Sequence, residues 1–144
     1  MTQVAQILSS KSSPQVATID AQDSVYDAIK QMAERGIGAL VVTTGGEIAG
    51  IVTERDYARK VVLKDRSSKS TKVAEIMSSA VRYVSPQQTS QECMALMTEH
   101  RIRHLPVLDK GKMVGMISIG DLVADIISEQ QFTIEQLEQY ITGR

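Results

Sequence analysis

The sequence predicts an α+β fold made of two copies of one β-α-β-β-α unit, packed with pseudo-two-fold symmetry. The first observation is an internal repeat, because a shift of 65 positions aligns residues 16–57 with 81–122 without a gap. The second is that each copy alternates short β-branched runs with apolar stripes of helical spacing. One copy of about forty residues cannot bury its own apolar face, so the two copies are expected to pack together.

Composition limits the class of protein. With 144 residues and 42% hydrophobic residues, the chain is long enough for one compact domain with an apolar core. A net charge of −1 gives no broad basic surface for nucleic acid or membranes. No apolar segment reaches the ~18 residues of a membrane span, and no signal peptide begins the chain, so a cytoplasmic protein is expected. Cys93 is the only cysteine, which excludes an intrachain disulfide and a cysteine-cluster metal site.

Each copy is expected to begin with a short strand, at 16–19 in the first, and to continue with a capped helix. Ser24 is the candidate N-cap in the first copy, with Asp27 three residues later, and Thr89 and Glu92 repeat this spacing. An apolar stripe follows in both helices, and we expect it to lie in the core. Its members are Val25, Ala28, Ile29 and Met32, matched by Cys93, Met94 and Met97.

A β-hairpin is predicted next in each copy. Residues 39–42 and 105–108 read as buried strands, and glycine-containing turns follow at 44–46 and 109–111. Return strands are expected at 48–53 and 113–118, each followed by a helix, at 56–63 and 121–128.

Segments outside the main repeat complete the domain organisation. Residues 4–8 resemble 73–77 and predict short lead-in helices, while the polar stretch 64–72 is the expected linker. We therefore expect a first unit over 1–66 with its lead-in helix, a second unit over 67–129, and a C-terminal helix over 130–144. Ile134, Leu137 and Ile141 would share one face of that last helix, to cover either its own chain or a second subunit.

The chemistry is concentrated where each return strand ends. Thr53 is followed three residues later by Asp56, and Ser118 by Asp121, each pair at a predicted helix start. One interpretation is structural, because a hydroxyl N-cap and an acid at N3 form a capping box. The other is functional, because such a carboxylate can accept hydrogen bonds from the vicinal diol of a ribose while helix N–H groups face phosphate.

Four motifs carry a resemblance to a known family. They are Gly-Ile-Gly-Ala-Leu-Val-Val at 36–42, Gly-Ile-Val-Thr-Glu-Arg-Asp at 50–56, Arg-His-Leu-Pro-Val at 103–107 and Gly-Met-Ile-Ser-Ile-Gly-Asp at 115–121. Together, and in register, they resemble a tandem pair of CBS (cystathionine β-synthase) domains, also called a Bateman module. The stretch 50–63 is similar to small stand-alone bacterial CBS-pair proteins.

The resemblance implies a non-catalytic regulatory module or energy sensor with two clefts between its units. Such clefts bind adenosine-containing ligands, namely AMP, ADP, ATP, S-adenosylmethionine or NAD(H). Asp56 would share a cleft with Arg103 and His104, and Asp121 with Gly38, Ala39 and Thr18. Backbone groups near Thr18 and Tyr83 would read the adenine edge. The apolar walls would be Ile37, Val41, Ile102 and Pro106.

The two copies differ in charge around the expected ligand. Arg101, Arg103 and His104 stand where the first copy has Gly36, Gly38 and Ala39, and Arg55 has Gly120 as its counterpart. Arginine suits phosphate, so the Asp56 cleft is expected to hold the phosphate-binding cations. The alternative is that the arginines are solvated charges at a helix end and that His104 is structural.

Other function classes are less well supported by the residues. Neither a Walker-type loop nor a Gly-x-Gly-x-x-Gly motif is present, and His100 and His104 lack metal-ligand spacing, so neither an enzyme nor a metal site is expected. A homodimer with an unidentified effector protein is expected from the resemblance. Two rivals stay open: an interaction module with vestigial clefts, and a nucleic-acid binder. The cations for the latter would be Arg55, Arg59, Lys60, Lys64 and Arg66.

Overall fold

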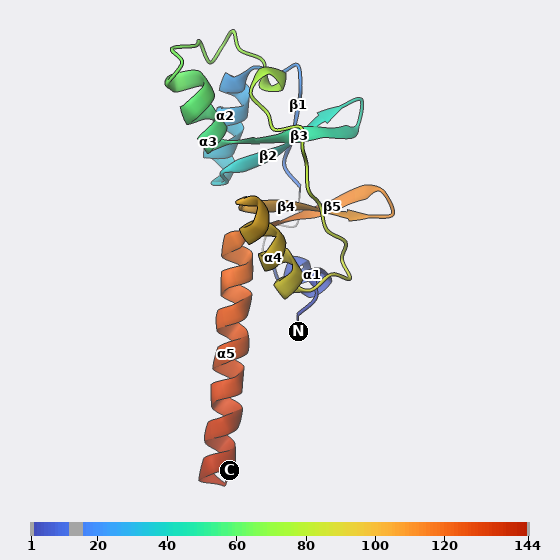
Figure 1. The fold of residues 1–144 in the computed structure, drawn as a ribbon, viewed down its shortest axis with the longest axis vertical. Coiled ribbons are helices and arrows are strands. Elements are labelled where there is room, and N and C mark those ends of the chain that lie inside the picture. The colour runs from blue at the N-terminus through green and yellow to red at the C-terminus, as the bar shows by residue number, and fades with distance from the viewer. Residues whose placement is uncertain (1, 12–15, 144) are drawn as a thin grey trace. The chain divides into compact units, whose positions relative to one another are not determined.

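A computed structural model describes residues 2–11 and 16–143, and the chain forms two compact units (Figure 1). One unit is Val16–Arg82, here called the Asp56 unit. The other, the Asp121 unit, combines Met1–Gln15 with Tyr83–Arg144. These ranges differ from the expected division at residue 66, because the segment before each repeat packs with the other repeat.

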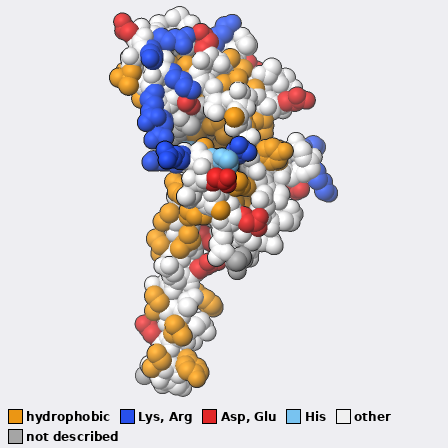
Figure 2. All heavy atoms as spheres, in the orientation of Figure 1, with side chains coloured by type: hydrophobic (Ala, Val, Ile, Leu, Met, Phe, Trp, Pro, Cys, Tyr) orange, Lys and Arg blue, Asp and Glu red, His pale blue; other side chains and the backbone are white. Residues whose placement is uncertain are grey.

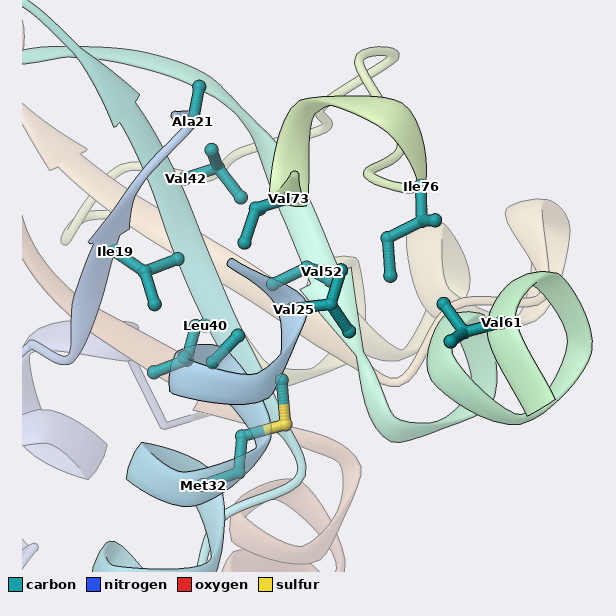
Figure 3. Packing of buried hydrophobic residues seen from close by; sticks show 11 residues of the cluster. Ile19, Ala21, Val25, Met32, Leu40, Val42, Val52, Val61, Val73 and Ile76 are labelled. Atoms are coloured by element: carbon teal, nitrogen blue, oxygen red, sulfur yellow. The ribbon is translucent and has the colours of Figure 1, made fainter. Parts of the chain in front are cut away.

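The Asp56 unit contains a three-stranded sheet. Its strands are β1 (Thr18–Asp20), β2 (Ala39–Thr44) and β3 (Glu47–Thr53), with β1 parallel to β2 and β2 antiparallel to β3. Helix α2 (Val25–Arg35) packs on this sheet through the predicted stripe (Figure 3). Helix α3 (Glu54–Tyr57) follows β3 and continues as a π-helical turn, η1 (Ala58–Val62).

The Asp121 unit repeats the hairpin but not the first strand. It contains α4 (Ser90–His100), β4 (His104–Asp109), β5 (Lys112–Ser118) and α5 (Ile119–Thr142). The strand expected near residue 81 is reduced to a single parallel bridge between Val84 and Val107. Pro86 explains the difference, because it stands where Ala21 donates its N–H to the Thr43 carbonyl at 3.0 Å, and proline has no N–H.

The local signals in the sequence are confirmed. Ser24 caps α2 and Thr89 caps α4, each side chain accepting from the N–H three residues later. Both hairpins turn through two residues with positive φ, at Gly45-Gly46 and Lys110-Gly111. Cys93 and Met97 are buried in the core of the Asp121 unit, as their stripe predicts.

Backbone hydrogen bonds hold each lead-in segment in place. Helix α1 (Val4–Ser10) begins with Val4 N–H donating to Gln88 O at 2.8 Å, within the Asp121 unit. In the Asp56 unit, Val73 N–H donates to Asp23 O at 2.9 Å and opens a single 3-10 turn, η2 (Val73–Glu75). The expected linker, residues 64–72, is also attached to the Asp56 unit by a backbone hydrogen bond, because Val25 N–H donates to Thr71 O at 2.8 Å.

Helix α5 differs from the expectation of two separate helices at 121–128 and 130–144. It runs without interruption over Ile119–Thr142, because neither glycine nor proline interrupts it between Gly120 and Gly143. Leu122 is its only fully buried side chain among the described residues. None of the helices described here is both long and apolar enough to cross a membrane.

Candidate ligand-binding sites

Asp56 sits in a complete capping box at the start of α3. Its Oδ2 accepts hydrogen bonds from Thr53 N and Thr53 Oγ1, both at 3.0 Å, while its own N–H donates to Thr53 Oγ1 at 3.1 Å. Its Oδ1 lies 3.2 Å from Lys60 Nζ, which also donates to the Ile76 carbonyl at 2.9 Å. The structural interpretation of this acid is therefore confirmed, and the carboxylate is held in one orientation.

Asp121 repeats this arrangement at the start of α5. Its Oδ2 accepts from Ser118 N at 2.9 Å, and its N–H donates to Ser118 Oγ at 3.1 Å. Lys11, which follows α1, donates to the same Oδ2 at 3.0 Å and to the Met116 carbonyl at 2.8 Å. Among the described residues none donates to Oδ1, so this oxygen of Asp121 is available as an acceptor.

Strand register explains which predicted residues of the Asp56 unit share a face. Thr18 pairs with Val41, and Ala39 pairs with Thr53. Paired residues project on the same side of a sheet, so these four lie on one face. The alternate residues Leu40, Val42 and Val52 belong to the core on the other face. These four predicted residues thus lie on the side of the sheet away from the core of their own unit, and Ala39 and Val41 are buried.

The hairpin of the Asp121 unit also has one face with predicted site residues and one face packed in the core. His104 pairs with Ser118 and Pro106 pairs with Met116, which places these four on one face. Leu105, Val107 and Ile117 form the core on the other face.

In both units, the first N–H of the helix after the hairpin donates a hydrogen bond to a backbone carbonyl that precedes the hairpin. Glu54 N–H donates to the Gly38 carbonyl at 3.1 Å, and Ile119 N–H donates to the Arg103 carbonyl at 2.9 Å. These bonds join Gly38 to the Asp56 capping box and Arg103 to the Asp121 capping box. At Gly38 a Cβ atom would lie 3.1 Å from Glu54 Oε1, so the glycine gives that acidic side chain room.

The predicted site residues outside these two sheet faces differ in burial. Ile37 and Ile102 pack against the two hydrophobic cores, which makes core packing their observed contact in this structure. Among the other predicted site residues, five are exposed to solvent: Arg55, Tyr83, Arg101, Arg103 and Gly120. Arg101 has φ of 53° as the residue that ends α4, matching Gly36 with φ of 65° after α2.

Two lysines at these sites were missed by the sequence interpretation. Lys60 is a candidate cation of the nucleic-acid alternative above, although its spacing of four residues from Asp56 also predicts a helical ion pair. The ion pair of Lys11 could not be predicted from sequence spacing, because its partner, Asp121, is distant in the chain.

Burial and charge shift two pKa values in the Asp121 unit. Burial alone would raise the pKa of Asp121, but the hydrogen bonds from Ser118 N and Lys11, with the Lys11 charge, lower it below the ordinary value. Burial lowers the pKa of His104; the Asp121 charge opposes this shift, whereas Lys11 and Arg103 add to it. His104 is therefore neutral near pH 7 and can act as a hydrogen-bond donor and acceptor.

The remaining reactive groups are placed by burial. Cys93 is fully buried, which raises the pKa of its thiol to about 11, and a protonated thiol is a poor nucleophile. Within residues 2–11 and 16–143, no three His, Cys, Asp or Glu side chains are grouped as metal ligands.

Comparison with known protein families identifies the family of the two repeated units. The sequence matches the CBS domain family twice, over residues 4–63 and 73–128. The chain is a member of the CBS-domain family. It contains a tandem CBS pair, as the four motifs predict, and pairs of this kind are in general regulatory modules.

Relatives support the CBS assignment over most of the chain. CBSX3, a mitochondrial CBS domain-containing protein of Arabidopsis thaliana, is 47% identical over 126 residues, which is 84% of this chain and 61% of that protein. This chain therefore spans about three fifths of that relative. YhcV of Bacillus subtilis is 31% identical over 116 residues, covering 81% of this chain and 82% of its own.

Solved structures show the same CBS fold. A protein with CBS domains from Burkholderia ambifaria MC40-6 is 67% identical, with a TM-score of 0.87 over 92% of this chain and 99% of that one. A hexameric CBS-CP12 protein from bloom-forming cyanobacteria is 31% identical, with a TM-score of 0.76 over 85% of this chain and 70% of that one.

Proposed function

We propose that this CBS pair is a non-catalytic sensor that binds an adenine nucleotide through Asp56 and Asp121. The observation that carries the proposal is the repeated one: each unit holds a carboxylate in a capping box, beside the sheet face away from its core. The ligands in question, AMP, ADP, ATP, NAD(H) and S-adenosylmethionine, all contain adenosine with its ribose diol.

The chemistry of a ribose site follows from the acceptors. An ionised carboxylate only accepts hydrogen bonds, and each of its oxygens has two lone pairs, so one free oxygen can accept from both hydroxyls of a vicinal diol. Asp121 offers Oδ1 without a competing donor among the described residues, while its Oδ2 is already shared by Ser118 N and Lys11. At Asp56 a diol has to share Oδ1 with Lys60. We therefore expect the Asp121 site to bind adenosine more tightly than the Asp56 site.

Arginine side chains near the two capping boxes are the candidates for binding the phosphate group of a nucleotide. The Arg103 carbonyl accepts the first N–H of α5, and the Arg103 side chain is exposed. Arg55 lies next to Asp56 within α3, and its side chain is also exposed. A guanidinium can bind a phosphate in a bidentate manner. The Asp121 unit contributes Arg101 as a further exposed cation, whereas Gly36 takes that position in the other unit.

Binding is expected to regulate rather than to transform the ligand. A ligand shifts the arrangement of the protein only if it binds one arrangement more tightly. The chain is also proposed to act as an oligomer, as its hexameric cyanobacterial relative does. The regulated partner would be an effector protein.

Calorimetric titration of dialysed protein with AMP, ATP, NADH and S-adenosylmethionine tests the proposal. Binding of one of them should weaken roughly tenfold to hundredfold in Asp121→Ala, because a charged hydrogen-bond acceptor is lost. Glu92→Ala is the matched control, since Glu92 completes the capping box of α4 outside the candidate sites. No binding by any of the four would favour the rival function, a protein-interaction module in which both acids serve only as helix caps.

A further inference from the structure

Helix α5 carries an apolar stripe that no described part of the chain covers. Val123 is 45% exposed, Ile127 60%, Ile134 49%, Leu137 56% and Ile141 80%. Figure 1 shows the C-terminal half of α5 extending away from the hairpin of its own unit, and Figure 2 shows apolar side chains along that length. We call the stripe the α5 seam; its positions are Val123, Ile127, Gln130, Ile134, Leu137 and Ile141.

The spacing of the seam is that of a coiled coil. From Val123 to Ile141 the steps alternate between four and three residues, so each pair of successive steps spans one heptad of seven residues. Ile127, Ile134 and Ile141 then occupy the a positions of successive heptads. Val123, Gln130 and Leu137 occupy the d positions. β-Branched residues at a with leucine at d favour two parallel strands, and here all three a positions are isoleucine and one of the three d positions, Leu137, is leucine. The polar Gln130, at a d position, would meet its own equivalent only in an in-register pair.

The length of the uncovered helix also calls for a partner. Every described side chain from Gln130 to Gly143 is exposed. A single helix of about a dozen residues is marginal in water, because propagation hardly offsets nucleation. Packing of the seam on another helix would supply the missing stabilisation.

The flanking positions indicate what that helix is. The e and g positions beside the seam are Ala124, Gln131, Glu138, Ile126, Thr133 and Tyr140, with one charge among six. A different partner is normally selected by complementary charges at these positions, whereas uncharged flanks let two identical helices meet without like-charge repulsion. Phe132 lies on the opposite side of the helix, outside the seam.

We propose that the α5 seam packs against the same seam of a second copy of this chain, as a parallel, in-register two-stranded coiled coil. The proposal is independent of nucleotide binding, since it uses no residue of the candidate sites.

Disulfide cross-linking of the intact protein tests the geometry. In a parallel, in-register coil a d residue faces its own equivalent, so Gln130→Cys should form a covalent dimer under mild oxidation. Phe132→Cys on the opposite face is the control and should not. Cys93 adds little background because it is buried. Absence of the Gln130→Cys dimer, or equal cross-linking of both variants, would overturn the parallel in-register coil.

Light scattering tests whether the seam holds the assembly. Leu137→Asp should halve the measured molar mass and lower the helical circular dichroism signal, whereas Phe132→Asp should leave the mass unchanged. A wild-type protein that is monomeric, or a Leu137→Asp variant with the wild-type mass, would contradict the proposal.

Discussion

Lys11 Nζ donates to Oδ2 of Asp121 at 3.0 Å although the two residues lie 110 positions apart. The same ammonium donates to the Met116 carbonyl, so one lysine joins the segment after α1 to β5 and to the start of α5. In the other unit Lys60, from the same turn region as Asp56, supplies the equivalent charge. The equivalent acids of the two repeats, Asp56 and Asp121, are therefore each paired with a lysine, but the two lysines do not occupy equivalent positions in the repeats.

Asp121 is expected to make the fold sensitive to acid. Its pKa is lowered in the folded chain, so its contribution to stability is complete above the ordinary aspartate pKa and is lost as pH falls through the lowered value. The urea midpoint of the wild type should thus fall as the pH is lowered from about 5 through the ordinary aspartate pKa of about 3.9 and further, and fall less in Asp121→Asn. Equal falls in both proteins would show that Asp121 is not linked to folding.

His104 reports on the charges beside it. Removing the Lys11 charge in Lys11→Met should raise the His104 pKa, and removing the carboxylate charge in Asp121→Asn should lower it further. Imidazole proton shifts in an NMR titration measure both changes. Shifts of the same sign in the two variants would contradict the placement of His104 between these opposite charges.

Gly50 and Gly115, one in each β-hairpin, should differ in their tolerance of alanine. At Gly50 a Cβ would lie 2.5 Å from the Ser78 carbonyl oxygen, a backbone atom held by the hydrogen bonds between Ile51 and Ser78. Gly50→Ala should therefore cost about 1–3 kcal/mol in urea unfolding.

Gly115→Ala is the matched variant and should cost less. Its Cβ would meet Leu8 Cδ2 at 2.6 Å, the end of a side chain that can rotate away. The Leu8→Ala change should then cost less in the Gly115→Ala background than in the wild type, because the two sites are in contact. A larger loss for Gly115→Ala than for Gly50→Ala would contradict this account.

Asp125 is expected to destabilise the Asp121 unit. Its Oδ2 is buried and has no hydrogen-bond partner among the described residues, and it follows Asp121 by one helical turn, where the other unit has Lys60. Asp125→Ala should raise the free energy of unfolding by about 1 kcal/mol. The exposed Ser128→Ala on the same helix controls for the gain in helix propensity. An equal gain in both would remove the buried oxygen as the cause.

Arg103 should distinguish a phosphate from a nucleoside. If its exposed guanidinium binds phosphate, Arg103→Met weakens AMP strongly and leaves adenosine nearly unchanged in calorimetry. Equal losses for the two ligands would assign Arg103 to structure alone.

Local patterns in the sequence determined the two hairpins, their turns, the helix caps and the core stripes, because each depends on residues within a few positions of one another. The repeat of 65 residues likewise predicted two matching carboxylates, Asp56 and Asp121. The loss of the strand before α4 also has a local cause, Pro86, but its effect depends on the hydrogen bond that Ala21 makes at the matching position of the other unit.

Tertiary structure alone decided which segment completes which unit. Val4 bonds to Gln88 and Lys11 to Asp121 across most of the chain, and no periodicity records such a pairing. The same holds for Ile37 and Ile102, whose apolar character suits a ligand wall and a core equally well. Contacts between distant residues depend on how the folded surfaces fit, whereas turns and caps depend on the backbone preferences of the residues themselves.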